Sequence, residues 1–356
     1  MSSMTGNKIK ISVFGQSHSK GIGIVIDGLP AGKKIDIEKV LKLMDRRAPG
    51  KNSLSKQRKE SDTPEILSGL VNGVTCGAPL SMVIYNENQH SADYNNIIDM
   101  PRPSHADFSA NVRYNGFNDV SGGGHFSGRL TAPLCFAGAI CMQILEDMGI
   151  EIQAHIQKIK NVYDDKIDYV NIGKWNTAEK VFPVINDEKG KLMIAEIEKA
   201  RGNGDSVGGV IECAVTGVKA GYGDPMFNGV ENQLAKNIFG IPAVKGIEFG
   251  NGFDATDLYG SENNDDFCIV DGEIKTTTNN SGGINGGITN GMPIVFRTAI
   301  KPTPSIFKEQ NSVSLKSKTE EKLQIKGRHD PCIVQRAVPV VEAVTAFTLL
   351  DIILFE

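Results

Sequence analysis

Hydrophobic and polar positions alternate with the two-residue period of a β-strand in several parts of the chain. Five segments combine this pattern, or a short apolar run, with flanking turn residues, and we expect each to form a strand. They are residues 9–14, 23–26, 80–85, 208–218 and 294–300. A polar turn separates the first two, and the last two are apolar enough to predict buried strands.

Four other segments have apolar residues at helical spacing or in long runs, which predicts helices. They are residues 36–47, 132–148, 191–201 and 337–355. In the first segment Ile37, Val40, Leu41 and Met44 are expected on one buried face. The second should be a buried helix that Gly149 ends.

The apolar run at the end of the chain is long enough to raise the question of a membrane span. Pro339, Glu342 and Asp351 interrupt it, and two carboxylates inside a lipid bilayer would be costly. A core helix is therefore the better interpretation. The first residues lack the basic and then apolar pattern of a signal peptide, so we expect no membrane association.

Strands and helices mix without regular β-α-β alternation, which favours an α+β fold over a doubly wound parallel sheet. No linker or repeat divides residues 1–356, and we expect a single domain. Long segments rich in polar residues and glycine predict mobile loops. They lie near residues 86–118, 260–290 and 308–321.

The composition of the chain argues against nucleic acid and zinc as binding partners and against a disulfide framework. The net charge of −4 and the absence of a long basic stripe argue against a nucleic-acid binder. The six cysteines are scattered without a C-x-x-C pair, so we expect neither a zinc site nor a disulfide framework. A reducing cytoplasm is the simplest location.

The segment 327–332, Gly-Arg-His-Asp-Pro-Cys, precedes the apolar C-terminal run. Pro331 disfavours helical backbone at Asp330, so the helix should begin no earlier than Pro331. Ionisable side chains at a helix N-terminus are well placed to bind an anion or to transfer protons.

Five further clusters could carry chemistry, and they lie in residues 15–19, 46–47, 102–107, 121–129 and 282–305. Each also has an ordinary interpretation: a surface histidine, a solvated helix end or a flexible glycine turn. Taken together, arginines, histidines and a placed aspartate in an acidic protein suit a small, multiply anionic substrate that needs proton transfers. The residues alone leave the reaction type open.

In their order along the chain, these blocks resemble the chorismate synthases. The resemblance covers nearly the whole chain and is carried by Ser17-His18, Asp45-Arg46-Arg47-x-Pro49-Gly50, Arg102-Pro103-x-His105-Ala106-Asp107, the glycines 122–124 with Ser127 and Arg129, Gly286, Lys301-Pro302-Thr303, and Gly327-Arg328-His329-Asp330-Pro331-Cys332 with Arg336. It implies a β-α-β sandwich, a homotetramer, and elimination of phosphate from 5-enolpyruvylshikimate 3-phosphate to give chorismate. It also implies reduced flavin mononucleotide (FMN) as cofactor and, given the compact length, an external flavin reductant.

The resemblance also implies roles for single residues. His18 would protonate the reduced flavin or its substrate-bound form, His105 would act as acid on the departing phosphate, and Asp330 would help to remove the ring proton. The residues implied to bind the substrate are Arg47, Arg129 and Arg336. The residues implied to contact the flavin are His125, Phe126, Ser127, Ala243, Gly286, Lys301, Pro302, Thr303, Pro304, Ser305 and Arg328.

Some positions depart from the family pattern. His125-Phe126 stands where Arg-Ser is typical, Gln16 replaces a glutamate, and Ser19 and Ser104 replace glycines. A non-catalytic flavin- or anion-binding relative is therefore an alternative. A metal-independent phosphatase that uses a histidine and Asp330 is another.

Overall fold

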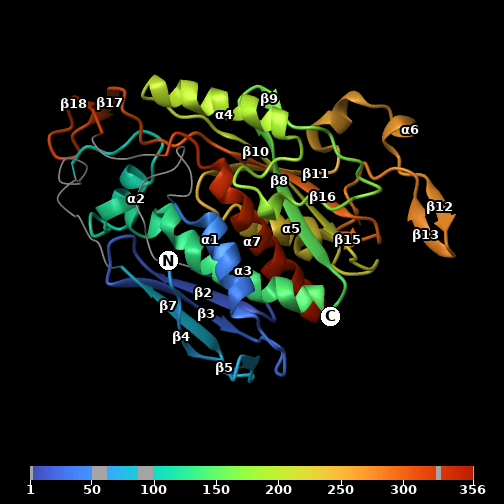
Figure 1. Cartoon of the computed structure of the whole chain (residues 1–356). Coiled ribbons are helices and arrows are strands. Elements are labelled where there is room, and N and C mark those ends of the chain that lie inside the picture. Colours follow the sequence, from blue (N-terminus) through green and yellow to red (C-terminus); the bar gives the residue numbers. More distant parts are fainter. Residues whose placement is uncertain (1–2, 50–61, 87–98, 326–329, 356) are drawn as a thin grey trace.

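Two five-stranded sheets enclose a layer of helices in a computed structural model of the chain (Figure 1). The structure describes residues 3–49, 62–86, 99–325 and 330–355. All neighbouring strands in the two sheets are antiparallel. The helix layer contacts both sheets. The α+β class and the β-α-β sandwich are thus confirmed.

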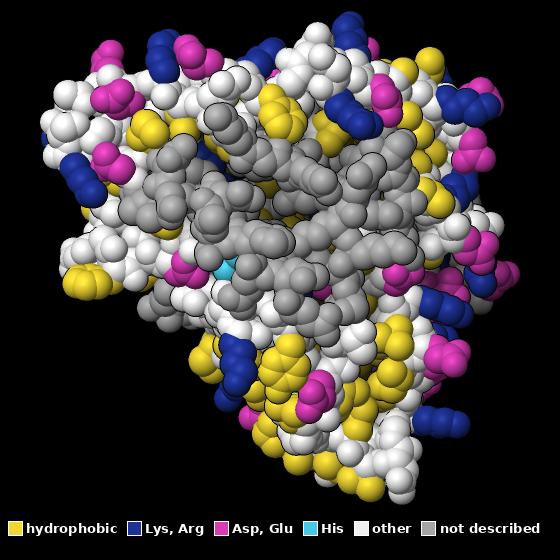
Figure 2. All heavy atoms as spheres, turned by 60° about the vertical axis from the view of Figure 1, so that its left-hand side comes forward, with side chains coloured by type: hydrophobic (Ala, Val, Ile, Leu, Met, Phe, Trp, Pro, Cys, Tyr) yellow, Lys and Arg dark blue, Asp and Glu magenta, His cyan; other side chains and the backbone are white. Residues whose placement is uncertain are grey.

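The first sheet has the strand order β1-β2-β3-β7-β4. Its strands are β1 (Met4–Thr5), β2 (Lys10–Gly15), β3 (Gly21–Asp27), β7 (Leu80–Tyr85) and β4 (Glu65–Ser68). Apolar side chains of its inner face pack on the helices, and several outward ones are exposed. Figure 2 shows hydrophobic side chains gathered on the lower part of the molecule, where this sheet lies.

The second sheet has the strand order β11-β16-β10-β8-β9. Its strands are β11 (Val244–Phe249), β16 (Ile294–Ile300), β10 (Gly209–Thr216), β8 (Glu151–Ile159) and β9 (Val162–Tyr163). Predicted strands 208–218 and 294–300 correspond to β10 and β16. These two strands pair in the inner part of the sheet, and most of their residues are apolar and buried.

Four helices form the central layer, and a fifth lies outside it. They are α1 (Ile37–Arg47), α3 (Thr131–Glu146), α5 (Val230–Ile238), α7 (Val334–Phe355) and the outer α4 (Asp187–Gly202). Helix α3 packs against α7 and against strands of both sheets. A Cβ atom on Gly138 would lie 2.3 Å from the Cα atom of Ala343, so glycine is needed where α3 and α7 meet.

Helix α1 begins at the predicted place because the Asp36 carboxylate accepts hydrogen bonds from the backbone N–H groups of Glu38 and Lys39. One part of its predicted face is wrong. Leu41 is 39% exposed, and Leu43 is buried in its place. The buried face of α1 is centred on positions 40, 43, 44 and 47, which contact α3 and α7.

Helix α7 begins after Pro331, as predicted, and its two carboxylates have partners. Glu342 forms a bidentate ion pair with Arg46, with distances of 2.6 and 3.0 Å. Asp351 accepts hydrogen bonds from the backbone N–H groups of residues 7–9. These groups tie the central helix to α1 and to the start of the first sheet.

Two helices are apolar and long enough to pass as membrane spans by composition. They are Gly128–Glu146 and Val334–Phe355, and 83% and 89% of their apolar windows are buried in the protein. Burial of this kind is typical of core helices, which pass the same test of length and composition.

The three predicted loop segments contain more secondary structure than expected. Within them the described residues form α2 (Asp107–Arg113), α6 (Gly260–Asn263) and the hairpins β12–β13 (Phe267–Val270, Glu273–Thr276), β14–β15 (Ile284–Asn285, Ile288–Thr289) and β17–β18 (Gln310–Val313, Glu320–Leu323). A further short hairpin is β5–β6 (Leu70–Val71, Val74–Thr75). The strands of these hairpins are short and lack the alternation that marks a half-buried strand, which explains the error. Strand β12 is apolar in sequence but largely exposed. That the segments are mobile remains a prediction.

Candidate active site

The triple glycine turn lies between the two predicted catalytic histidines. Gly122, Gly123 and Gly124 all have positive φ angles, of 60°, 87° and 54°. A Cβ atom on Gly122 would lie 2.1 Å from the imidazole of His18, and one on Gly123 would lie 3.3 Å from the imidazole of His105. The turn therefore needs glycine both for its backbone conformation and for its contact with the two rings.

His18 is half-buried on the turn between β2 and β3. The backbone N–H of Ser17 donates a hydrogen bond to the carbonyl of Gly124 at 3.0 Å. The Ser19 hydroxyl donates to the carbonyl of Gly21, and it accepts from the N–H of Gln16. The first bond holds the histidine turn against the glycine turn, and the other two stabilise the histidine turn itself. The pairing of β2 with β3 confirms the predicted strand–turn–strand unit.

His105 forms a buried network with Asp107 and Arg102. Its Nδ1 atom is 2.6 Å from Asp107 Oδ1 and 3.1 Å from Arg102 Nη2. Nδ1 cannot accept from Arg102 while it donates to Asp107, and the shorter contact with the carboxylate identifies Nδ1–H as the donor. The opposite edge of the ring, with Nε2, faces Gly123.

The Asp107 carboxylate stays ionised in this network. Burial opposes its ionisation, but hydrogen bonds from Arg102 and then from His105 outweigh burial and hold the pKa of Asp107 well below its usual range. Arg102 donates to both carboxylate oxygens, at 2.7 and 2.8 Å. Asp107 can therefore orient His105 and stabilise its protonated form.

The three arginines predicted to bind substrate lie together. Arg47 and Arg129 each place one Nη1 atom 2.8 Å from the same carboxylate, that of Asp62. Arg336 donates from Nε to the carbonyl oxygen of Arg47 at 3.0 Å. Burial, and then the charge of Arg336, lower the pKa of Arg47. The arrangement is a concentrated positive site that needs anions close to it.

Asp330 belongs to the same cluster. Its Oδ2 atom accepts a hydrogen bond from Arg336 Nη1 at 2.5 Å, and the residue is 6% exposed. The contact crosses from the segment before α7 to the first turns of the helix. Gly327, Arg328 and His329 lie outside the described residues.

The altered turn at His125 is held by hydrogen bonds of its own. Nδ1 of His125 donates to the carbonyl of Gly15 at 2.6 Å, and Nε2 is 2.7 Å from the Ser3 hydroxyl. Ser127 caps the short helix that follows by accepting from the N–H of Arg129. Phe126 is 38% exposed. His125 thus connects the glycine turn to the first sheet, a role that the sequence did not indicate.

Lys301 connects the end of β16 to the His105 loop. Its backbone N–H donates to the carbonyl of Ala243, and its ammonium group donates to the carbonyl of Ser104. Ala243 and Ser104 have φ angles of 75° and 59°, a conformation that favours glycine. Burial, and then the charge of Lys245, lower the pKa of Lys301.

The remaining predicted flavin residues lie on the segment after β16 and in the β14–β15 turn. Pro302 is exposed, Pro304 is half-buried and Ser305 is buried on the segment after β16. The Thr303 hydroxyl is buried and has no hydrogen-bond partner in the described part of the chain. Gly286 lies in the β14–β15 turn, with open space where a Cβ atom would be.

Sequence reasoning missed two residues of this site. Asp62 bridges Arg47 and Arg129, and Asn86 accepts a hydrogen bond from Arg129 Nε at 2.8 Å. Both lie in polar stretches without a motif of their own. Arg46, in contrast, belonged to a predicted anion-binding pair, and the structure pairs it with Glu342 instead.

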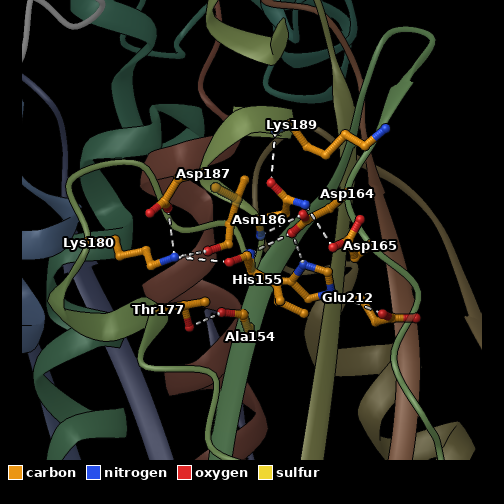
Figure 3. Close-up of polar contacts among 12 residues, drawn as sticks. Ala154, His155, Asp164, Asp165, Thr177, Lys180, Asn186, Asp187, Lys189 and Glu212 are labelled. Atoms are coloured by element: carbon orange, nitrogen blue, oxygen red, sulfur yellow. Dashed lines mark hydrogen bonds and ion pairs between the residues drawn. The ribbon is translucent and has the colours of Figure 1, made fainter. Parts of the chain in front are cut away.

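A second buried cluster lies away from this site, in the second sheet (Figure 3). His155 on β8 is fully buried, and its two nitrogens are 2.9 Å from Asp164 and 3.0 Å from Glu212. Burial lowers the pKa of His155, but the hydrogen bonds to Asp164 and Glu212 raise it by more. Tyr169 donates to the second oxygen of Glu212 at 2.7 Å. The cluster ties the loop after β9 to β8 and β10.

Comparisons with known proteins agree on one family. The family model described as "Chorismate synthase" matches residues 9–354. The chorismate synthase of Korarchaeum cryptofilum is 45% identical over 97% of this chain and 96% of its own length. That of Pyrococcus abyssi is 46% identical over 99% of this chain and 98% of its own length.

A solved structure supports the same assignment. It is described as "Crystal Structure of Chorismate Synthase", has a TM-score of 0.77 and is 27% identical in sequence. The similarity covers 99% of this chain and 93% of that one. The matched sequence, the fold and the residues that the fold brings together show that this chain belongs to the chorismate synthase family.

Proposed function

We propose that this chain is a lyase that eliminates phosphate from 5-enolpyruvylshikimate 3-phosphate to give chorismate, the last common step of aromatic amino-acid biosynthesis. The proposal depends above all on one observation: the glycine turn contacts both His18 and His105. The same segment continues to Arg129 and to the carbonyl of Gly128, which accepts from Arg47. Proton donors and anion-binding groups therefore flank one short segment.

The protein has to bind the anionic groups of the substrate, protonate the departing phosphate and accept the ring proton. One C–O bond to phosphate and one ring C–H bond break in an anti-1,4 sense, a second ring double bond forms, and the proton leaves to a base. Phosphate is a better leaving group when positive charge surrounds it and an acid protonates it. Arg47, Arg129 and Arg336 supply the charge for the substrate's anionic groups.

His105 is the proposed acid. Its Nδ1–H is held by Asp107, so a second proton on Nε2 can pass to the departing phosphate while the carboxylate stabilises the imidazolium. His18, on the other side of the glycine turn, is the second proposed proton donor. Asp330 is the proposed acceptor of the ring proton, and the hydrogen bond from Arg336 orients its carboxylate.

The residues present fit the cofactor that the family implies, reduced FMN. A flavin has a planar polar ring and a phosphate, and the buried Thr303 hydroxyl is a polar group in need of a partner. Lys301, Ala243 and the segment 302–305 would hold it, together with the turn His125, Phe126 and Ser127. Reduced FMN, when bound, would lend an electron to the reaction and recover it, with no net redox change.

Other features belong to the same proposal. Reduced flavin would come from an external reductant, as the family resemblance implies. We also propose a homotetramer, as the family resemblance implies. A cytoplasmic location agrees with six cysteines that are all free thiols. The intact, hydrogen-bonded turn at His125 disfavours a non-catalytic relative.

Anaerobic turnover tests the proposal. Purified protein would be mixed with substrate and chemically reduced FMN, and chorismate absorbance and phosphate release followed together. Equal amounts of the two products, absent with oxidised FMN, are expected. Phosphate released without flavin would indicate a phosphatase, and flavin binding without turnover would indicate a non-catalytic relative.

A further inference from the structure

The Asp62 carboxylate bridges two arginines of the cluster, Arg47 and Arg129. Its Oδ2 atom is 2.8 Å from Arg47 Nη1, and its Oδ1 atom is 2.8 Å from Arg129 Nη1. The three side chains are 5%, 4% and 10% exposed. Each oxygen therefore satisfies a different guanidinium, as two oxygens of a bound phosphate or carboxylate would.

Both guanidinium groups are also held by neutral partners. Arg47 donates from Nε to the Thr131 hydroxyl and from Nη2 to the carbonyl of Gly128, at 3.0 Å each. Arg129 donates from Nε to the side-chain oxygen of Asn86. These bonds fix the positions of both arginines without Asp62, so the carboxylate is not needed to orient them.

Charge explains why an anion must be present there. Arg47 is buried and lies next to Arg336, and both burial and that neighbouring charge lower the pKa of Arg47. Buried cations without a counter-ion are strongly unfavourable. Asp62 supplies the counter-ion while no ligand is bound, and an anionic group of a ligand offers the same charge to the same N–H groups.

We propose that Asp62 is a resident counter-ion that occupies the substrate's anion position and is displaced when the substrate binds. The inference rests on the proposed function, in which Arg47 and Arg129 receive the substrate. Displacement makes Asp62 a determinant of specificity. A ligand must compete with a carboxylate already in place, so multiply charged groups such as a phosphate dianion are favoured over single charges.

The variant Asp62→Asn tests the proposal. Affinities for inorganic phosphate and for the substrate would be measured by calorimetry without flavin. The variant should bind the substrate about tenfold more tightly or better, a change of about 1.4 kcal/mol. Its melting temperature without ligand should be lower, and the rise on adding ligand should be larger than in the wild type.

Glu342→Gln is the matched control, because it removes the carboxylate of another buried ion pair, with Arg46. It should lower the melting temperature and leave ligand affinity unchanged. Unchanged or weaker substrate binding by Asp62→Asn would overturn the counter-ion proposal. Weaker binding in particular would mean that Asp62 orients the arginines.

Two further outcomes distinguish a failure of the proposed function from a failure of the counter-ion proposal. If the wild type binds neither substrate nor phosphate, the proposed function is contradicted, and a gain of phosphate affinity in Asp62→Asn would still support the counter-ion. If the variant does not fold, a structure of the wild type with substrate decides. Loss of the Asp62 contacts to Arg47 and Arg129 supports displacement, and retention of both contacts overturns it.

Discussion

Replacement of Asp107 by asparagine removes one negative charge beside His105 and changes little in shape. Asp107 accepts hydrogen bonds from the backbone N–H, Nε and Nη2 of Arg102 and from Nδ1 of His105. An asparagine keeps one acceptor oxygen and turns the other position into a donor that faces N–H groups. The imidazolium of His105 loses its charged partner as a result.

The expected decrease in kcat follows from the hydrogen bond between Asp107 and His105. A hydrogen bond between charged groups contributes about 1.5–3 kcal/mol. If it stabilises the proton-donating form of His105, its loss should lower kcat by about 10- to 100-fold, because each 1.36 kcal/mol is a tenfold change in rate.

Single-turnover kinetics, with KM measured separately, would check this prediction. A double-mutant cycle with His105→Ala isolates the coupling, because Asp107→Asn should cost little more once the imidazole is absent. Circular dichroism and the melting temperature show whether the variant folds. A folded Asp107→Asn protein with wild-type kcat would refute the reasoning.

Three other substitutions have expected outcomes. Gly122→Ala should fold poorly or lose most activity, since its Cβ atom would overlap the His18 ring; wild-type kcat would contradict this contact. Ser104→Gly should raise the free energy of unfolding by up to about 1 kcal/mol, measured with urea, because φ is 59° there, and a loss of stability would contradict the assigned strain. His155→Gln should lower the free energy of unfolding by about 3–5 kcal/mol, because two carboxylates lose their partner. Since the folded-state pKa of His155 is raised, that loss should be largest below about pH 6.5 and shrink as pH rises through the folded pKa, and a difference independent of pH would contradict a charged His155.

Features that depend on local pattern could be predicted from the sequence. The strand–turn–strand unit around His18 and the buried C-terminal helix follow from alternation, apolar runs and turn residues. The helix cap at Asp36 also depends only on neighbouring residues. Leu41 was placed wrongly because the packing of other helices, which sequence spacing does not specify, decides where a buried face is centred.

Features that depend on distant partners could not be predicted. Asp62 has no motif, and its role appears only when the fold brings Arg47 and Arg129 to it. His155 stands in an ordinary strand sequence, and its charge partners come from β10 and from the loop after β9. Ionic clusters of this kind are specified by tertiary contact, and single-sequence reasoning found only the ones that a family pattern marks.

A crystal structure with 5-enolpyruvylshikimate 3-phosphate and oxidised FMN would test the central claim most directly. The account predicts a phosphate oxygen within about 2.6–3.2 Å of His105 Nε2 and an anionic group of the substrate on Arg47 and Arg129. The flavin should lie against the segment that contains Lys301 and Thr303. Substrate bound elsewhere, with the glycine turn and both histidines free of ligand, would contradict the account.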